Sequence, residues 1–456
     1  MTQPSGYTAE STQYRRLVAS LFLGGTAVFA QLYAPQAVLP LIGRDLGLTA
    51  GQAGLVVSVG TIGLALGVIP WAGLSGRYGR VNTMRAAILA GTGLTLLSCF
   101  ATTLPLLLAA RFVAGFAIGA VPALALSYLN AEVRRDAAAR GAGVFIAGNS
   151  IGGLLGRILA GVAAGHWGWQ GGMLAVSLLS AAAAVGFVML VQPDACPDSE
   201  CDHVRTKVTK GEGRIHSPVV AFSGPKRYLA LLSDPMQRRI YLIGFLLMGA
   251  FVTVYNYLGY RLQAAPFNLP SSMTSFLFVG LLAGTVASVL TGGLVIRHGR
   301  KAVIAVSGGV LAVGVAVTLI PQMWAQVCGL VLVTLGFFGG QSVASGWASA
   351  GPMAGRTQAG ALYTLAYYAG GSLVGWCGGE VLERSGWLGL VIMVAALGVA
   401  VAGAATMPLL PAKIRSSLMA VARDTPARHD VATPRVRTKR QKSLAESPSG
   451  TWVKNY

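Results

Sequence analysis

Long apolar stretches alternate with short polar segments along most of this chain. Because unpaired backbone N–H and C=O groups are not tolerated in lipid, a stretch of about 20 apolar residues is predicted to cross a bilayer as an α-helix. Twelve such stretches occur, at roughly 17–41, 52–74, 82–101, 105–129, 141–165, 169–191, 239–260, 272–294, 302–320, 323–347, 359–380 and 386–408. The pattern therefore predicts an all-α membrane protein with twelve transmembrane helices.

Composition agrees with this prediction. Hydrophobic residues make up 54% of the 456 residues and charged residues only 11%, whereas soluble domains carry about 25% charged residues. The 61 glycines favour close helix packing in a membrane. The five cysteines show no disulfide pattern, and no metal site or cofactor is predicted.

The net charge of +20 is distributed asymmetrically. If the N-terminus is cytoplasmic, only Arg44, Arg261 and Arg384 fall in outside loops. Apart from two arginines inside spans, the remaining Lys and Arg fall on the cytoplasmic side, as the positive-inside rule requires. We therefore expect a multi-pass protein of the plasma (bacterial inner) membrane with both termini in the cytoplasm, and no nucleic-acid partner.

Six spans precede a polar central segment and six follow it. The predicted organisation is a cytoplasmic N-terminus, a six-helix bundle, a cytoplasmic linker, a second six-helix bundle and a basic, disordered cytoplasmic tail. These parts cover residues 1–16, 17–191, 192–238, 239–408 and 409–456.

Two repeats indicate that the halves are duplicates. The pattern Gly-Leu-x-x-Arg-x-Gly-Arg occurs at 73–80 and again at 293–300, and AGNSIGGLLG at 147–156 matches AGGSLVGWCG at 369–378. The two offsets agree within two residues. Duplicated bundles around a site near the membrane midplane are a recurring design of secondary transporters.

Several motifs resemble those of one transporter superfamily. GLSGRYGR resembles the loop signature of the major facilitator superfamily, and Arg111 with Gly115 resembles the Arg-x-x-x-Gly element of its drug–proton antiporters. Gly148, Gly152 and Gly153 resemble the G-P-x-x-G-G motif of that group. The runs AGNSIGGLLGRILAGV, FLLMGAFVTVYNYLGYRL and SVASGWASAGPMA are similar to the acriflavine-sensitivity subfamily of bacterial inner-membrane permeases. The resemblance implies the major facilitator fold, with two pseudo-symmetric six-helix bundles, and proton-coupled drug efflux.

The loop repeats are candidates for a cytoplasmic gate. Arginine fits helix C-terminal carbonyls and nearby carboxylates, so we predict that Arg77 or Arg80 pairs with Glu132 when the cytoplasmic side is shut. The acidic residue of the family signature is replaced by Gly76 and Ile296, so the family's charge relay cannot run in the same way. Alternatively, these arginines only set the topology. The predicted gate residues are Arg77, Gly79, Arg80, Glu132, Arg297, Gly299 and Arg300.

Two arginines fall inside spans, where a charge costs roughly 2.5–3.5 kcal/mol on insertion scales. Arg111 and Arg157 are expected roughly 9–12 Å below the outer surface, either snorkelling toward the headgroups or facing a positively charged cavity. None of the fifteen Asp and Glu residues lies in the middle of a span. Glu380 comes nearest and is the candidate for proton coupling. A basic cavity without a buried acid favours a neutral or anionic substrate.

Polar and aromatic residues within the spans suggest the lining of a substrate cavity. Each of them could instead form an interhelical hydrogen bond or lie at the membrane interface. The resemblance adds weight to spans 1, 4, 7 and 10, which line the cavity in the superfamily. The predicted lining is Tyr33, Gln36, Arg111, Asn149, Arg157, Tyr255, Asn256, Gln341 and Tyr367.

The sequence therefore favours a secondary active transporter, not an enzyme, working by alternating access. The leading hypothesis is efflux of drug-like or amphipathic small molecules, with protons as a possible coupling ion. Transport of organic anions or sugars is the alternative, and a non-transporting membrane sensor is a remote one. The chain contains no phosphate-binding G-x-x-x-x-G-K-[ST] motif, and we expect a monomer in the lipid bilayer.

Overall fold

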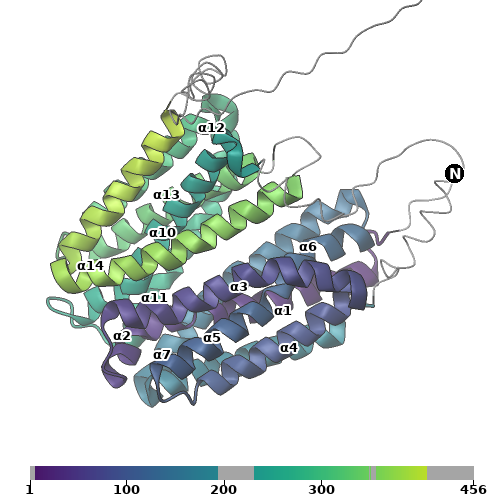
Figure 1. Cartoon of the computed structure of the whole chain (residues 1–456), viewed down its shortest axis with the longest axis horizontal. Helices are drawn as coiled ribbons and strands as arrows, with labels where there is room; N and C mark the ends of the chain where they lie inside the picture. Colours follow the sequence, from purple (N-terminus) through teal and green to yellow (C-terminus); the bar gives the residue numbers. More distant parts are fainter. Residues whose placement is uncertain (1–5, 194–230, 349, 351–355, 408–456) are drawn as a thin grey trace, which may run out of the picture. The chain divides into compact units, whose positions relative to one another are not determined.

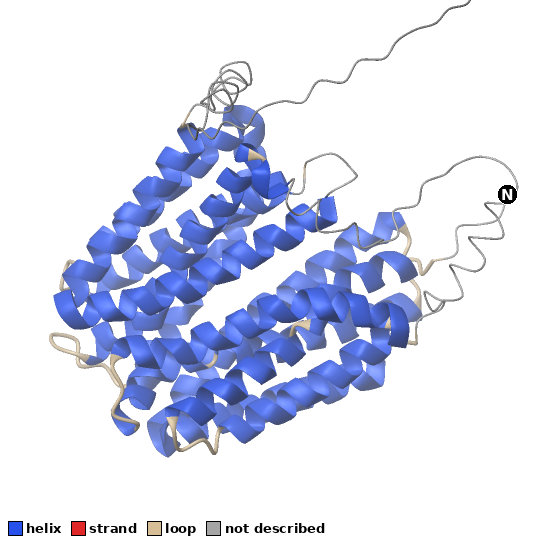
Figure 2. Ribbon diagram, viewed as in Figure 1, coloured by secondary structure: helices blue, strands red, loops and turns tan. Residues whose placement is uncertain are grey.

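The computed structural model describes residues 6–193, 231–348, 350 and 356–407, and these are almost entirely helical (Figure 2). The N-terminal half contains α1 (Thr12–Tyr33), α2 (Pro35–Asp45), α3 (Ala50–Tyr78), α4 (Arg80–Ser98), α5 (Leu104–Ile118), α6 (Ala120–Glu132) and α7 (Arg135–Leu190). The C-terminal half contains α10 (Pro235–Gln263), α11 (Ser271–Phe276), the 3₁₀ helix η1 (Leu277–Leu282), α12 (Ala283–Val317), α13 (Met323–Ala348) and α14 (Arg356–Thr406). The helices of each half lie together (Figure 1). The predicted tail and most of the predicted linker lie outside the described residues.

These helices account for the twelve predicted spans. By length and composition, eight described helical stretches can cross a membrane. Three of them are 54, 47 and 49 residues long, enough for two crossings each at 1.5 Å per residue. Each contains a glycine with a positive φ, at Gly168, Gly299 and Gly386, where one helix ends and the next begins. The shorter α4 supplies the remaining span, so the all-α, twelve-helix prediction is confirmed.

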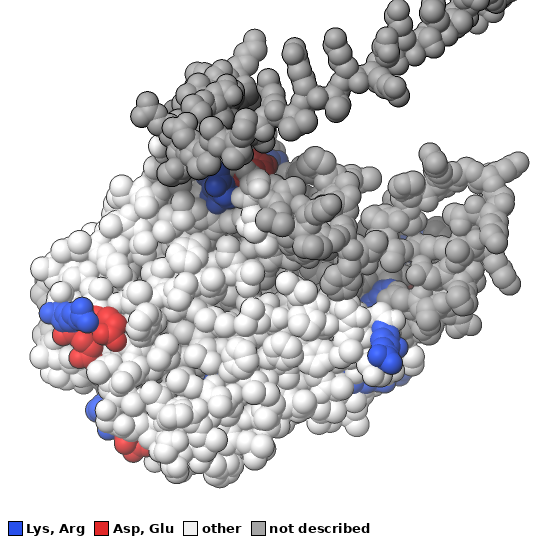
Figure 3. Space-filling model, in the orientation of Figure 1, with Lys and Arg blue, Asp and Glu red and all other residues white. Residues whose placement is uncertain are grey.

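The positions of charged residues fit a membrane protein. On the face drawn in Figure 3, Lys, Arg, Asp and Glu gather near the ends of the helices, with a broad uncharged surface between them. The exposed residues of the protein include large apolar side chains, among them Ile296, Val289 and Ile392. In water such a surface would be unfavourable, but in lipid it is the expected exterior.

The duplicated loop motif has the same backbone conformation in both halves. Gly79, between α3 and α4, has φ 81° and ψ 154°, and Gly299, inside α12, has φ 81° and ψ 159°. A side chain is strained at this positive φ, which explains why glycine stands at both positions. The sequence repeat therefore encodes a repeated turn between consecutive spans.

The second repeat forms equivalent helix contacts. Gly148 in α7 lies against the carbonyl oxygen of Phe22 in α1, and Gly370 in α14 lies against that of Phe245 in α10. A Cβ at either glycine would come within 3.0 Å of that oxygen, closer than real Cβ contacts. Spans 1 and 5, and likewise spans 7 and 11, thus pack backbone to backbone through glycine.

Gly370→Ala tests this packing. The added methyl group meets backbone that cannot move aside, and overpacking costs about 1–3 kcal/mol, more than the gain of roughly 1 kcal/mol in helix propensity. We expect the melting temperature in detergent to fall by a few degrees. Gly309→Ala in α12 is the matched control, because a Cβ there meets nothing within 4 Å. An equal or higher melting temperature for Gly370→Ala than for Gly309→Ala would contradict the packing assignment.

Candidate functional site

A cavity of about 170 Å³ lies where helices of the two halves meet. The N-terminal half contributes residues of α1 and α7, and the C-terminal half contributes residues of α10, η1, α12, α13 and α14. Among the described residues, its lining holds one charged residue, Arg157, and no Asp or Glu. Seven aromatic rings line it: Phe29, Tyr33, Phe251, Phe337, Phe338, Tyr367 and Tyr368.

Arg157 in α7 is 4% exposed and has only neutral hydrogen-bond partners. Its Nε donates to Oε1 of Gln36 at 2.7 Å, and its Nη1 donates to the carbonyl oxygen of Gly153 at 2.7 Å. The guanidinium carbon lies 4.5 Å from the centre of the Tyr33 ring and 5.3 Å from that of Phe278. Cation–π contact with two rings stabilises part of this charge.

Gln36 connects Arg157 to the other half. While Oε1 of Gln36 accepts from Arg157, its Nε2 donates to Oδ1 of Asn256 in α10 at 2.7 Å. Both Gln36 and Asn256 are fully buried. One polar chain therefore runs from α7 through α2 to α10, beside the cavity.

Arg111 is buried too, but it does not line the cavity. Its Nη1 donates to the carbonyl oxygen of Gln31 at 3.0 Å and its Nη2 to that of Leu32 at 2.8 Å. The helix is interrupted here between α1 and α2, and Pro35 has no N–H to donate to Gln31. The guanidinium replaces the missing donor, so in this conformation Arg111 is a structural group of the α1–α2 break.

The other predicted lining residues also include some that line the cavity and some that do not. Tyr33, Asn149 and Tyr367 line the cavity with Arg157. Gln36 and Asn256 form the polar chain beside it. The hydroxyl of Tyr255 shares a 2.7 Å hydrogen bond with Thr334, and Gln341 accepts a hydrogen bond from Tyr363; neither lines the cavity.

Sequence reasoning missed most of the aromatic lining. Phe337 and Phe338 are adjacent in α13, and the Phe337 ring stacks on Phe251 with centroids 4.0 Å apart. Phenylalanine in an apolar span has no contrast with its neighbours, so no pattern singles it out. A weak signal for part of this lining is that Phe29 and Tyr33 in span 1 recur as Phe251 and Tyr255 in span 7, at the same spacing as the repeat at 147–156 and 369–378.

Contacts between the halves continue along α3 and α14. Ser58 Oγ donates to the carbonyl oxygen of Ser372 at 3.1 Å, and Thr61 Oγ1 lies 2.9 Å from Ser372 Oγ. Farther along, Gly51 and Gly379 approach so closely that a Cβ on Gly379 would contact the Gly51 backbone. These small residues let the two helices touch.

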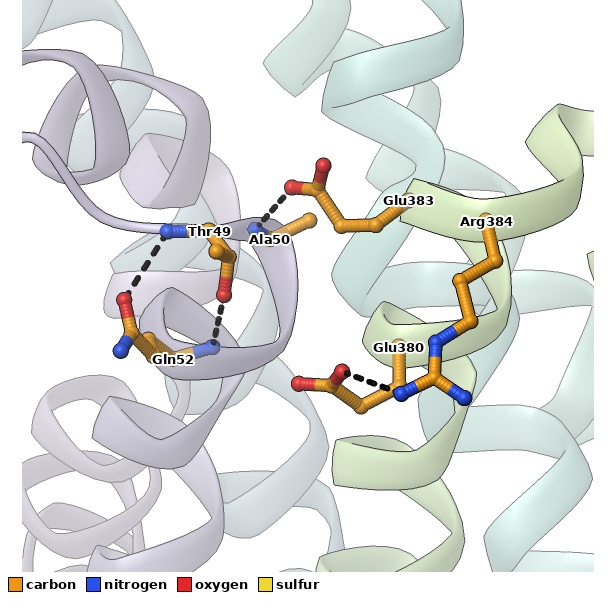
Figure 4. Close-up of polar contacts among 6 residues, drawn as sticks. All are labelled: Thr49, Ala50, Gln52, Glu380, Glu383 and Arg384. Carbon is orange, nitrogen blue, oxygen red and sulfur yellow. Dashed lines mark hydrogen bonds and ion pairs between the residues drawn. The ribbon is translucent and has the colours of Figure 1, made fainter.

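Two glutamates of α14 meet the first turn of α3 (Figure 4). Glu383 Oε1 accepts a 2.6 Å hydrogen bond from the backbone N–H of Ala50, while Thr49 and Gln52 cap each other. Glu380, the predicted coupling residue, points its carboxylate at Gly51 and pairs with Arg384 at 3.8 Å. The N-terminus of a helix carries unpaired N–H groups and a partial positive charge, so both carboxylates stabilise this contact.

The predicted gate residues lie at the end of the helix bundle that is opposite to the Glu383–Ala50 contact. Arg80 donates to the carbonyl oxygen of Ser127 in α6 at 3.4 Å, and Arg300 lies over the Trp347 ring at 5.9 Å. Arg77 and Arg297 are exposed, whereas Glu132 is 7% exposed. The pairing of Arg77 or Arg80 with Glu132 stays a prediction.

Comparison with known proteins places these features in a family. The model of the Major Facilitator Superfamily matches residues 21–375. The chain is 32% identical over 398 residues to the inner membrane transport protein YnfM of Escherichia coli, covering 87% of this chain and 91% of that one. It is 30% identical over 381 residues to the uncharacterized MFS-type transporter YybF of Bacillus subtilis, covering 84% of this chain and 90% of that one.

Solved structures show the same fold at low identity. A crystal structure of a D-xylose–proton symporter matches with a TM-score of 0.68 and 17% identity, covering 86% of this chain and 97% of that one. With its twelve spans in two related halves and a cavity between them, the chain belongs to the Major Facilitator Superfamily.

Proposed function

We propose that this membrane transporter exports a small amphipathic molecule across the inner membrane by alternating access. The observation that carries the proposal is the cavity lined from both halves, closed off on one side by contacts between those halves. Alternating access needs such a site together with closures that form and break by movement of one bundle against the other.

The closed side is the outer one under the predicted orientation. Among the described residues, the hydrogen bonds between the halves involve the α2 segment, the first part of α3, the end of α10 or the outer part of α14. These segments lie away from the basic loops at 75–80 and 296–301. The conformation is therefore assigned as inward-facing, with the α3–α14 contact as the outer closure.

The lining favours an amphipathic compound. Seven aromatic rings provide apolar contact area, while Asn149, Ser150 and Thr285 provide a few hydrogen-bonding groups. Such a mixture is typical of small-molecule sites. Export rather than import is supported by the resemblance of Arg111, Gly115 and the α7 glycines to efflux motifs.

Protons are the proposed coupling ion, acting at Glu380 and Glu383. The charged residues near these two carboxylates are Arg384 on α14, Arg261 on α10 and Arg44 on α2. Nη2 of Arg44 donates a hydrogen bond to Gln263. Protonation from outside removes the negative charge that these carboxylates place on the first turn of α3. The outer closure then weakens, so an external proton favours the outward-open state from which an exported substrate leaves.

Transport in proteoliposomes tests the proposal. Purified protein is reconstituted, a proton gradient is imposed, and cationic dyes, neutral amphiphiles and organic acids are screened. We expect gradient-dependent flux of at least one amphipathic class. Binding of a compound without flux in either direction would instead support a sensor, and flux unaffected by the gradient would exclude proton coupling.

Glu383→Ala tests the outer closure. In a variant without the five native cysteines, Ser58→Cys reports opening through its reaction with a membrane-impermeant maleimide added outside. Loss of a cap worth about 1 kcal/mol is expected to raise the labelling rate roughly fivefold. Glu10→Ala, an exposed glutamate before α1, is the control, and an unchanged rate in Glu383→Ala would contradict the closure.

The same reporter tests the proton dependence. With Glu380 and Glu383 intact, labelling is expected to be faster at acidic than at neutral external pH, because a protonated side chain no longer places a negative charge on the first turn of α3. The double variant Glu380→Gln/Glu383→Gln is expected to label rapidly at both pH values. A pH response that persists in the double variant would place the coupling group elsewhere.

A further inference from the structure

We propose that the transported molecule carries an anionic group of the carboxylate type, which binds the guanidinium of Arg157, and an aromatic or apolar body that packs in the ring-lined cavity. This inference rests on the proposed transport function and specifies its substrate class.

The charge of Arg157 is not compensated by an acidic side chain of the described residues. The side chain is 4% exposed and lies in a membrane span, yet its hydrogen-bond acceptors are the Gln36 amide and the Gly153 carbonyl, both neutral. Among the described residues, no Asp or Glu forms an ion pair with it or lines the cavity. Buried charges are normally paired, so the missing counter-ion points to a ligand.

The guanidinium of Arg157 also has N–H donors that are free to bind a ligand. A guanidinium has five N–H donors in a planar fork, and Arg157 spends one from Nε and one from Nη1 on protein acceptors. Within the described part of the chain, Nη2 donates no hydrogen bond. A carboxylate can accept from Nη1 and Nη2 together, in the bidentate geometry that arginine favours.

Arg111 differs from Arg157 in this respect. Both of its Nη atoms already donate to carbonyl oxygens of α1, and it does not line the cavity. Two buried arginines in the same half thus have different surroundings. Of these two arginines, only Arg157 lines the cavity.

The surroundings of Arg157 also define the rest of the ligand. Tyr33 lies against the guanidinium and, with Phe29 and Tyr367, continues into the cavity lining. Across the cavity, Phe251, Phe337 and Phe338 form a packed aromatic wall. A ligand with an anionic end at Arg157 can therefore place its apolar body against rings from both halves.

Binding at Arg157 is connected to the contact between α2 and α10. The same guanidinium holds Gln36, which in turn holds Asn256 of the other half. An anion that draws Arg157 toward the cavity weakens its bond to Gln36. Substrate binding and movement of the halves thus share one hydrogen-bond chain.

Isosteric ligands test the proposal in the purified full-length protein. The probes are 2-naphthoate, its neutral amide and 2-naphthylmethylamine, and the readouts are thermal stabilisation and affinity by calorimetry at probe concentrations up to about 10 mM. We expect the carboxylate to bind more tightly than either analogue. Arg157→Gln is expected to weaken carboxylate binding about 10- to 100-fold, as loss of a charge-assisted hydrogen bond predicts, and Arg157→Lys is expected to restore part of the preference.

Two control variants separate charge recognition from folding. Arg16→Gln removes an exposed charge at the start of α1 and should leave the carboxylate preference intact. Arg111→Gln removes the other buried guanidinium and should lower the melting temperature while keeping that preference. Equal binding of all three probes, no binding of the carboxylate, or an undiminished preference in folded Arg157→Gln would each overturn the proposal.

The transport assay distinguishes this failure from failure of the proposed function. Gradient-driven flux of neutral or cationic compounds that is unchanged in Arg157→Gln would refute the anionic substrate class and leave the transport function standing. Absence of flux for every compound class would refute the transport function itself.

Discussion

Inside a bilayer, polar backbone groups and charges must be satisfied by the protein, because no water is available to do so. The α1–α2 break shows how this chain meets that constraint. Pro35 leaves the Gln31 carbonyl without its usual donor, and Arg111 supplies two N–H groups at this point. The break can therefore persist at membrane depth, and α2 begins with Gln36 in position to meet Arg157.

The same constraint applies to Arg157, but its outcome differs from that at Arg111. Its neutral acceptors satisfy some donors but leave the positive charge uncompensated, and aromatic rings compensate only part of it. In a site of low polarity, the attraction between the guanidinium and an opposite charge is stronger than it is in water. Selectivity for charge thus follows from what the cavity lacks, namely a carboxylate, as much as from the arginine that it contains.

The sequence predicts the helices and the duplication well, because both depend on contrasts that survive in a single chain. Apolar runs stand out against polar loops, and Gly79 and Gly299 repeat because their backbone conformation requires glycine. It cannot predict which side of a helix faces the cavity when every side is apolar. Arg111 and Arg157 therefore looked equivalent, and only the structure separates a buried structural arginine from one that lines the site.

A shorter repeat shows what cannot be predicted from the sequence alone. Gly168 and Trp169 end the turn after span 5, and Gly386 and Trp387 end the turn after span 11. The indole nitrogens donate to Asp45 and Thr318, fixing each turn to a neighbouring helix. Two identical residues in an apolar chain carry too little information to be noticed, although they occupy equivalent places in the fold.

The contacts between the halves differ in how easily they can be exchanged for water. Glu383 and the Ala50 N–H lie near the ends of their spans, where water can replace their bond at a net cost of about 1 kcal/mol. Gln36 and Asn256 are fully buried, so separating them leaves Nε2 of Gln36 and Oδ1 of Asn256 without their bond unless water or substrate enters. The larger barrier to opening therefore lies at the chain that begins with Arg157. A substrate that engages Arg157 acts on the contact that is hardest to break, which is where binding energy can most effectively drive the change of access.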